Sequence, residues 1–286
     1  MTGTYRPKIL VPGPELGRIL PLNINDRDAV LSLMRKVKPD VIFHLAAQSI
    51  PRFSWAKQEE TFQTNVGGTI HLLEAMRRFA PGARFLFPSS IQVYGRTFRS
   101  GRAAKESDPL WPEHPYAASK IIAEYACLDF ARRFDLDVLI VRAFNHLGTG
   151  QPSSLVFSDW CRQIALAEKG EQEPILEVGN LEARRDFLHV EDVVRGYELL
   201  MRRGKKGTVY NLCSGKARPL TDYAQFLLKR AGVRMKIKVQ KNRLRRDDPP
   251  VMKGDPSRLK ALGWRPRRSP FEALEELLNE WRRKLA

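Results

Sequence analysis

The sequence lacks several features that would place it in a specialised class of protein. Its 286 residues include only three cysteines (Cys127, Cys161 and Cys213), and their wide spacing indicates neither a disulfide framework nor a zinc site. No apolar run reaches membrane-spanning length, and the first residues, MTGTYRPKIL, lack the apolar core of a signal peptide. There is no internal repeat and no low-complexity tract. We therefore expect a soluble cytoplasmic protein with no membrane association and no metal.

The charge is strongly unbalanced. The net charge is +17, and the stretch from Lys229 to the end holds 18 Lys and Arg against 7 Asp and Glu, a net +11. Three explanations are open: a solvated basic surface, an anionic small substrate, and nucleic acid. Nucleic acid ranks third, because no aromatic-basic module or helix-turn-helix spacing stands out, and we expect no nucleic-acid partner.

Short apolar runs alternate with helical patterns along the chain. The runs DVIFHLAA (40–47), RFLFPSS (84–90), DVLIVRAF (137–144) and GTVYNLCS (207–214) are typical of buried strands. Helical periodicity occupies Asp26–Val37, Asn65–Phe79, Tyr116–Phe134, Val156–Lys169 and Val190–Arg203. Such alternation predicts an α/β fold, with a doubly wound parallel sheet and helices on both faces. After about residue 150 the pattern loosens.

Small or polar residues follow three of these strands. His44 and two alanines end one, Ser89 and Ser90 end the next, and Asn145 with a glycine turn ends a third. Ligands of doubly wound sheets bind outside the carboxyl ends of the strands. These three strand ends therefore predict a ligand site.

The heptapeptide HPYAASK (114–120) carries the clearest chemical signal. Pro115 suits the first turn of a helix, so that Tyr116 and Lys120 lie one turn apart on one face. A nearby ammonium lowers the pKa of a phenol, which is otherwise near 10. Ser90 could hold a substrate carbonyl against the phenol. The set predicts proton transfer at an alcohol or ketone carbon during hydride transfer, although YxxxK alone also occurs on ordinary helix faces.

With these residues in place, the chain resembles the extended short-chain dehydrogenase/reductases that act on nucleotide sugars. The segments HLAAQS, TNVGGT, SSIQVYG, PYAASK, RAFNHLGTGQ, RRDFLHVEDVV and LGWRP stand in the family's order over nearly the whole chain. Within the family, FNHLGTGQ, EPILEVGNLEARRDF and VYNLCSG are most similar to the GDP-6-deoxy-4-keto-D-mannose reductases, which form GDP-D-rhamnose. The resemblance implies a Rossmann-like dinucleotide-binding domain over 1–150. A smaller lobe over 151–286 would bind the nucleotide sugar, with segments that return to the first domain.

The resemblance also implies a role for each matching residue. The catalytic set would be Ser90, Tyr116 and Lys120, with Tyr116 protonating the C4 alkoxide and Ser90 binding the keto oxygen. The cofactor would contact Arg6, Asn23, Ile24, Leu45, Ala46, Ala47, Asn65, Tyr116 and Lys120. The substrate would contact Ser90, Gln92, Asn145, Arg185, Arg245 and Asp248, since guanidinium groups bind diphosphates bidentately. For Arg185 a surface ion pair with Asp186 or Glu182 is the alternative, and for Arg245 a solvated loop.

Gln92 discriminates between related reactions. Dehydratases of the related group carry a glutamate at this position and use it as a base, whereas an amide accepts no proton near neutral pH. Reduction is therefore favoured over 4,6-dehydration. The alternatives are another nucleotide-sugar epimerase, reductase or dehydratase, and a non-catalytic nucleotide-sugar-binding protein. The resemblance implies NADP as cofactor (NAD is the alternative) and a homodimer through a four-helix contact.

The chain departs from the family at its beginning. The first strand and its glycine-rich GxxGxxG turn, which bind the cofactor pyrophosphate, do not precede the matching segments. GTYR resembles the end of the second strand, where Arg6 would pair with the 2′-phosphate of NADP. In the strand order 3-2-1-4-5-6 the first strand is central. We therefore expect that Met1 is an internal start. A native mass equal to the 32.8 kDa of this sequence would contradict that expectation.

Overall fold

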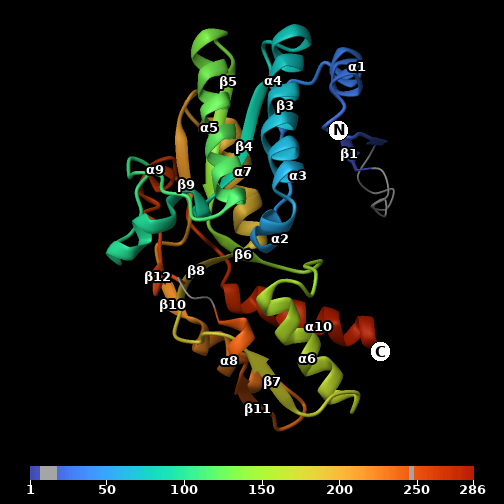
Figure 1. Ribbon diagram of the computed structural model, residues 1–286, viewed down its shortest axis with the longest axis vertical. Helices are drawn as coiled ribbons and strands as arrows, with labels where there is room; N and C mark the ends of the chain where they lie inside the picture. Colours follow the sequence, from blue (N-terminus) through green and yellow to red (C-terminus); the bar gives the residue numbers. More distant parts are fainter. Residues whose placement is uncertain (7–17, 245–247) are drawn as a thin grey trace. The chain divides into compact units, whose positions relative to one another are not determined.

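The computed structural model describes residues 1–6, 18–244 and 248–286 (Figure 1). The chain forms two compact units. Unit 1 comprises residues 1–95, 109–142 and 199–210, and unit 2 comprises residues 96–108, 143–198 and 211–286. The chain therefore passes between the units several times, and each unit is built from segments distant in sequence.

A four-stranded sheet forms the centre of unit 1. Its strands are β3 (Val41–Phe43), β4 (Arg84–Ser90), β5 (Asp137–Ala143) and β9 (Val209–Leu212), in the order β3-β4-β5-β9. β3 and β4 are parallel, with Val41 opposite Arg84 and Phe43 opposite Leu86. The four apolar runs are thus confirmed as strands. The α/β class with parallel strands is confirmed as well.

Helices cover this sheet and bury its apolar side chains. They are α1 (Arg27–Val37), α2 (Pro51–Ala56), α3 (Gln58–Phe62), α4 (Gly68–Phe79) and α5 (Pro115–Arg133), with a π-helical turn, η2 (Gln63–Gly67), leading into α4. α4 lies beside both α1 and α5 (Figure 1). The shared core includes Val30, Leu73, Met76, Phe85, Phe87, Ala123 and Ile140. Three of the five helices predicted from periodicity are confirmed here as α1, as η2 with α4, and as α5, and the other two are described below.

A second, two-stranded sheet belongs to unit 1. β1 (Thr2–Tyr5) and β2 (Arg18–Pro21) pair in parallel. Among the described residues no strand pairing joins this sheet to the four-stranded sheet, in which β3 is an outer strand. Val41 and Phe43 of β3 are 47% and 45% exposed. The expectation that the family's first strand and its glycine-rich turn are missing stays a prediction.

Unit 2 is built on smaller, mixed sheets. β8 (Arg184–His189) pairs in parallel with β6 (Asn145–Leu147) and β12 (Val251–Met252), and antiparallel with β10 (Ala217–Pro219). β7 (Ile175–Val178) and β11 (Lys236–Val239) form a separate parallel pair. The remaining elements that contribute to this unit are η3 (Ile91–Ser100), α6 (Val156–Glu168), α7 (Val190–Arg203), α8 (Leu220–Leu228), η4 (Lys241–Arg243), α9 (Ser257–Ala261) and α10 (Pro270–Leu285). η3 begins, and α7 ends, in unit 1.

The core of unit 2 lies between α6, α8 and α10. Trp160, Tyr223, Leu274 and Leu277 are almost fully buried there. α10 begins with a capping box, in which Ser269 and Glu272 satisfy each other's backbone N–H groups, and Pro270 occupies its first turn. None of the helices that the structure describes is long and apolar enough to cross a membrane.

Candidate active site

The start of α5 places the tyrosine and the lysine of HPYAASK. His114 is the N-cap: its Nδ1 accepts the backbone N–H of Ala117 at 3.2 Å, and Pro115 follows as the first helical residue. Tyr116 and Lys120 then lie one turn apart, 7% and 4% exposed. Burial of both side chains makes their protonation states depend on a few neighbouring groups.

Ser90 and Tyr116 come together at the end of β4. Their side chains are hydrogen-bonded, and Ser90 Oγ also accepts the backbone N–H of Gln92 at 3.2 Å. Burial raises the pKa of Tyr116 above its usual value of 10, and the bond to Ser90 offsets only part of the rise. The net direction is therefore opposite to the lowered pKa that the sequence predicted, because burial outweighs the opposing effects. The phenol is protonated at neutral pH, as a proton donor must be.

Lys120 is held by the backbone of the strand beside it. Its Nζ donates to the carbonyl of Pro88 at 2.8 Å and lies 4.7 Å from the centroid of the Phe87 ring. Burial lowers the pKa of Lys120 to about 8, against the opposing influence of Cys127 and Glu124. One ammonium proton is used by Pro88, which leaves two that can hydrogen-bond a ligand.

A buried ion pair supports α5 one turn further on. Glu124 accepts from Arg142 of β5, with Oε2 to Nη2 at 2.8 Å and Oε1 to Nε at 3.1 Å. Arg142 Nη1 also donates to the hydroxyl of Tyr94 at 3.1 Å. Burial lowers the pKa of Arg142, but hydrogen bonds and charge from Glu124 more than compensate and raise it overall. The pair fixes the helix that carries Tyr116 and Lys120 to the sheet.

Asn65 ties the end of β3 to the start of α5. Its Oδ1 accepts the N–H of Gln48 at 2.8 Å, and its Nδ2 donates to Gln48 O at 3.1 Å and to Ser119 Oγ at 2.9 Å. Ser119 in turn donates to the carbonyl of Tyr116 at 2.8 Å. One buried amide therefore positions both the backbone after β3 and the helix turn that carries Tyr116.

The three residues that follow His44 at the end of β3 are accessible. Leu45 is 67% exposed, Ala46 is exposed and Ala47 is half-buried, so a ligand can approach this backbone. His44 itself is buried, with its Nε2 2.9 Å from Thr69 Oγ1. Burial, with a smaller contribution from Lys120, lowers the pKa of His44 to about 3, so this imidazole is neutral.

The other residues expected to contact the cofactor lie near the beginning of the chain. The Arg6 guanidinium is exposed and pairs with Glu60 at 3.4 Å. Asn23 is exposed, and its Oδ1 accepts the N–H of Asn25 at 3.2 Å. The side chain of Ile24 packs in the core of unit 1, and its carbonyl lies 3.0 Å from Nδ1 of His71. Arg6 and Asn23 are thus accessible to a ligand, whereas the Ile24 side chain is not.

The expected substrate-binding residues outside the Ser90 cluster belong to unit 2. Arg185 Nη2 pairs with Asp248 Oδ1 at 2.7 Å, and Nη1 donates to the carbonyl of Pro249 at 2.8 Å. The structure therefore brings Arg185 and Asp248 together, and the Arg185 side chain is buried, so it does not form the surface ion pair considered as the alternative. Asn145 is half-buried at the start of β6. Arg245 lies outside the described residues.

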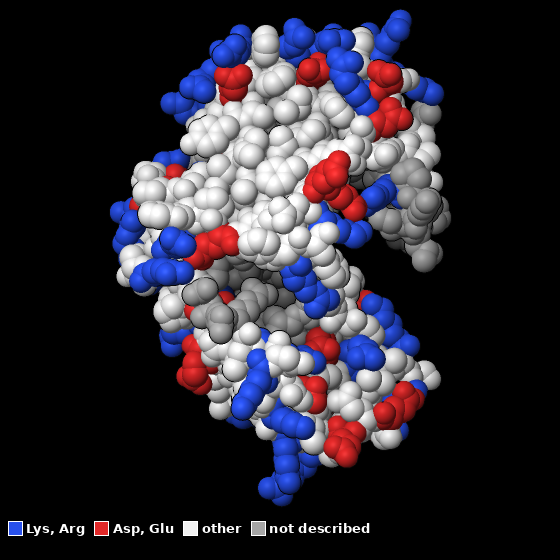
Figure 2. Space-filling model, in the orientation of Figure 1, with Lys and Arg blue, Asp and Glu red and all other residues white. Residues whose placement is uncertain are grey.

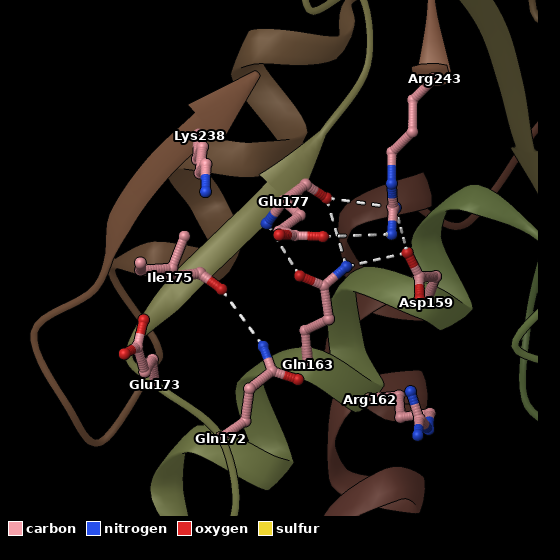
Figure 3. A pocket seen from close by; sticks show the side chains of 9 residues that line it. All are labelled: Asp159, Arg162, Gln163, Gln172, Glu173, Ile175, Glu177, Lys238 and Arg243. Atoms are coloured by element: carbon pink, nitrogen blue, oxygen red, sulfur yellow. Dashed lines mark hydrogen bonds and ion pairs between the residues drawn. The ribbon is translucent and has the colours of Figure 1, made fainter. Parts of the chain in front are cut away.

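Unit 2 also contains a polar pocket of about 400 Å³ between α6, β7 and η4 (Figure 3). Arg243 points toward Asp159 and Glu177, and its Nη1 lies 2.5 Å from Asp159 Oδ2 (Figure 3). Gln163 donates to Asp159 Oδ2 at 2.8 Å and accepts the N–H of Glu177 at 2.8 Å. The side chains of Asp159, Gln163, Glu177 and Arg243 are therefore hydrogen-bonded or ion-paired with one another within the pocket.

Basic side chains are widely distributed. On the visible face Lys and Arg are interspersed with Asp and Glu, while the area over α4 and α5 is mostly uncharged (Figure 2). Within residues 1–6, 18–244 and 248–286, no three His, Cys, Asp or Glu side chains gather as metal ligands.

The parallel sheet, the strand-end serine and the Tyr116–Lys120 helix define an extended short-chain dehydrogenase/reductase. The chain belongs to the GDP-mannose 4,6-dehydratase family, whose model matches residues 16–277. It is 35% identical over 244 residues to GDP-6-deoxy-D-mannose reductase of Pseudomonas aeruginosa, covering 85% of this chain and 80% of that protein.

Two solved structures show how far the likeness extends. The structure of RMD from Pseudomonas aeruginosa complexed with NADPH matches with a TM-score of 0.87 and 33% identity, over 93% of this chain and 90% of that one. A putative epimerase from Burkholderia cenocepacia matches with a TM-score of 0.86 and 27% identity, over 99% and 89%. The superfamily resemblance seen in the sequence motifs is thereby confirmed.

Several residues that shape the site were missed by the sequence analysis. His114, Gln48, Ser119, Glu124 and Arg142 all hold the predicted residues in place. Two signals could have found some of them. The residue before a helix-starting proline is the N-cap, which identifies His114, and Tyr116, Lys120 and Glu124 follow one another at four-residue intervals.

Proposed function

We propose that this protein reduces the 4-keto group of GDP-4-keto-6-deoxy-D-mannose to GDP-D-rhamnose with NADPH. The single observation that carries the proposal is the hydrogen bond between Ser90 and Tyr116, together with the position of Lys120 one helical turn after Tyr116. The likeness to the Pseudomonas aeruginosa reductase supports this choice of substrate. The nucleotide sugar is the substrate class that the family shares.

Tyr116 acts as the proton donor. Its buried phenol stays protonated at neutral pH, because burial raises its pKa. Ser90 Oγ already accepts from Gln92 N–H, so its own proton can point to the keto oxygen and hold it beside the phenol. As the carbonyl π bond opens, the oxygen takes the Tyr116 proton, and the phenol is reprotonated from solvent.

Lys120 provides a positive charge and hydrogen bonds beside the tyrosine. The ammonium that Pro88 O anchors is mostly protonated at neutral pH, because its pKa is about 8. Its two remaining protons suit the hydroxyls of a nicotinamide ribose. Its charge also stabilises the phenolate left on Tyr116 after proton donation.

The residues present fit the nicotinamide end of NADPH, which supplies a hydride when bound. The accessible backbone at Leu45, Ala46 and Ala47 and the partly unused ammonium of Lys120 are the observations that support this fit. Arg6 is the group proposed for the 2′-phosphate, since its pairing with Glu60 is exposed and long. The sequence has no GxxGxxG turn for the diphosphate, so NADPH affinity is the first quantity to measure.

Gln92 and the charged groups of unit 2 support the choice of reaction and substrate. An amide at position 92 cannot remove the C5 proton that dehydration requires. Arg185 and Asn145 are proposed to bind the diphosphate and the sugar. Asp248, which pairs with Arg185, would orient this guanidinium.

The test is a titration with NADPH and with NADH, followed by turnover of GDP-4-keto-6-deoxymannose. We expect tighter binding of NADPH and one NADPH oxidised per sugar reduced. Tyr116→Phe should lower kcat by about 10²- to 10⁴-fold while NADPH binding persists. Cofactor recycling without net oxidation would instead identify an epimerase, and sugar binding without turnover would identify a binding protein. If neither cofactor binds, the proposal fails for this chain, and the titration is repeated with an N-terminally extended form.

A homodimer through α4 and α5 is also proposed. Ile122 and Tyr125 of α5 are exposed, and the visible face over these helices is mostly uncharged (Figure 2). Light scattering should give about twice the 32.8 kDa chain mass. Ile122→Glu should return a folded monomer, and a monomeric wild type would contradict the proposal.

A further inference from the structure

The side chain of Gln92 has one orientation that its neighbours fix. His114 Nδ1 accepts the Ala117 N–H, so this nitrogen carries no proton in the neutral imidazole. The ring proton is therefore on Nε2. His114 Nε2 lies 3.2 Å from Gln92 Oε1, and an N–H facing a carbonyl oxygen makes a hydrogen bond there. The helix cap thus determines the tautomer, and the tautomer determines which end of the amide faces the ring.

The opposite end of the amide then faces away from His114. With Oε1 bound to the imidazole, Gln92 presents its two N–H donors to the remaining space. Gln92 is close to the reacting groups, because its backbone N–H donates to Ser90 Oγ. The His114 ring is also stacked on Tyr116, with centroids 6.0 Å apart and an interplanar angle of 12°. Ser90, Gln92, His114 and Tyr116 are therefore one cluster.

We propose that Gln92 donates a hydrogen bond to an oxygen of the bound keto sugar, and that His114 is the positioning residue that turns the amide into this donor. The proposal rests on the proposed function for the identity of the sugar. The proposed hydrogen bond would determine which sugars bind: those with a hydroxyl or keto oxygen at C4 or on a neighbouring carbon are accepted. An analogue that lacks this oxygen, or that carries an ammonium group in its place, offers no acceptor and loses the bond.

The matched variants are His114→Asn and Gln92→Leu. Asparagine is a good N-cap, so it retains the Ala117 bond and the start of α5, but it is too short to reach Gln92. We expect an unchanged melting temperature for His114→Asn. The KM for the keto sugar should rise roughly 3- to 10-fold, as for the loss of one hydrogen bond, with a smaller change in kcat. Gln92→Leu should give a similar or larger rise.

Two outcomes decide between positioning and a purely structural role. In the Gln92→Leu background, His114→Asn should raise KM no further, because His114 acts only through the amide. An equal rise in both backgrounds would overturn the proposal. The ¹⁵N chemical shifts of the His114 ring, assigned by their loss in His114→Asn, report the tautomer without any substrate. A proton on Nδ1 would also overturn it.

The tautomer measurement separates this proposal from the proposed function. If the wild type turns over no keto sugar, the proposed function fails, and the ring shifts alone decide whether His114 orients Gln92. If the wild type is active and the proton is on Nε2, the KM comparison decides whether the donor contacts the sugar.

Discussion

Replacing Arg142 with methionine should destabilise the protein by about 3–5 kcal/mol, because it leaves the Glu124 carboxylate buried without its cationic partner. The two side chains are 5% and 3% exposed, so water cannot replace the lost hydrogen bonds. Tyr94, which receives a bond from Arg142, would lose a partner as well. Urea unfolding followed by far-UV circular dichroism measures the change.

The double variant Glu124→Leu/Arg142→Met is the critical comparison. Removing both charges abolishes the desolvation penalty together with the attraction, so the double variant should lie within about 2 kcal/mol of wild type. Arg133→Met is the control. Arg133 lies on α5, like Glu124, and its ion pair with Asp129 is exposed and should contribute little to stability. A single Arg142 variant as stable as this control would refute the reasoning. A double variant as unstable as the sum of the two single variants would refute it too.

Three further changes probe other parts of unit 1. The kcat/KM should fall as the pH rises through about 8, where Lys120 loses its charge. Glu124→Leu/Arg142→Met should move this fall to lower pH, because Glu124 raises the pKa of Lys120. An unchanged pH profile in the double variant would contradict this. The folded state binds fewer protons at His44 than the unfolded chain between about pH 6.5 and 3, so stability present above that window is lost as the pH falls through it. His44→Gln should flatten this slope in urea midpoints compared at pH 7 and 4.5, and equal slopes would show that His44 is not responsible. Gly95→Ala should lower the melting temperature strongly, because a Cβ there would lie 1.8 Å from the carbonyl oxygen of Trp111 at a φ of +45°; an unchanged melting temperature would mean that this turn adapts.

Much of unit 1 could be predicted from local patterns. RFLFPSS coincides with β4, because a short apolar run is typical of a buried strand, and the predicted helix Tyr116–Phe134 coincides with α5, whose first turn contains Pro115. Tyr116 and Lys120 were found in the same way, since four residues make about one helical turn.

The unpredicted parts depend on contacts between distant segments. β12 has only two residues, which is too short for an alternation of apolar and polar residues to predict a strand or its pairing with β8. The pKa of Tyr116 could not be anticipated either. Its direction depends on how deeply the ring is buried and on the weaker opposing effect of Ser90, which are both properties of the folded chain.

The outer position of β3 has a consequence for how the protein behaves in solution. Among the described strands, β3 has a hydrogen-bonded neighbour on one side only, and its Val41 and Phe43 side chains are nearly half exposed. A short apolar strand with unpaired N–H and C=O groups is a template for a strand from another molecule. Self-association through this edge would grow with protein concentration, and it would compete with any strand that seals the sheet beside the accessible backbone of Leu45 and Ala46.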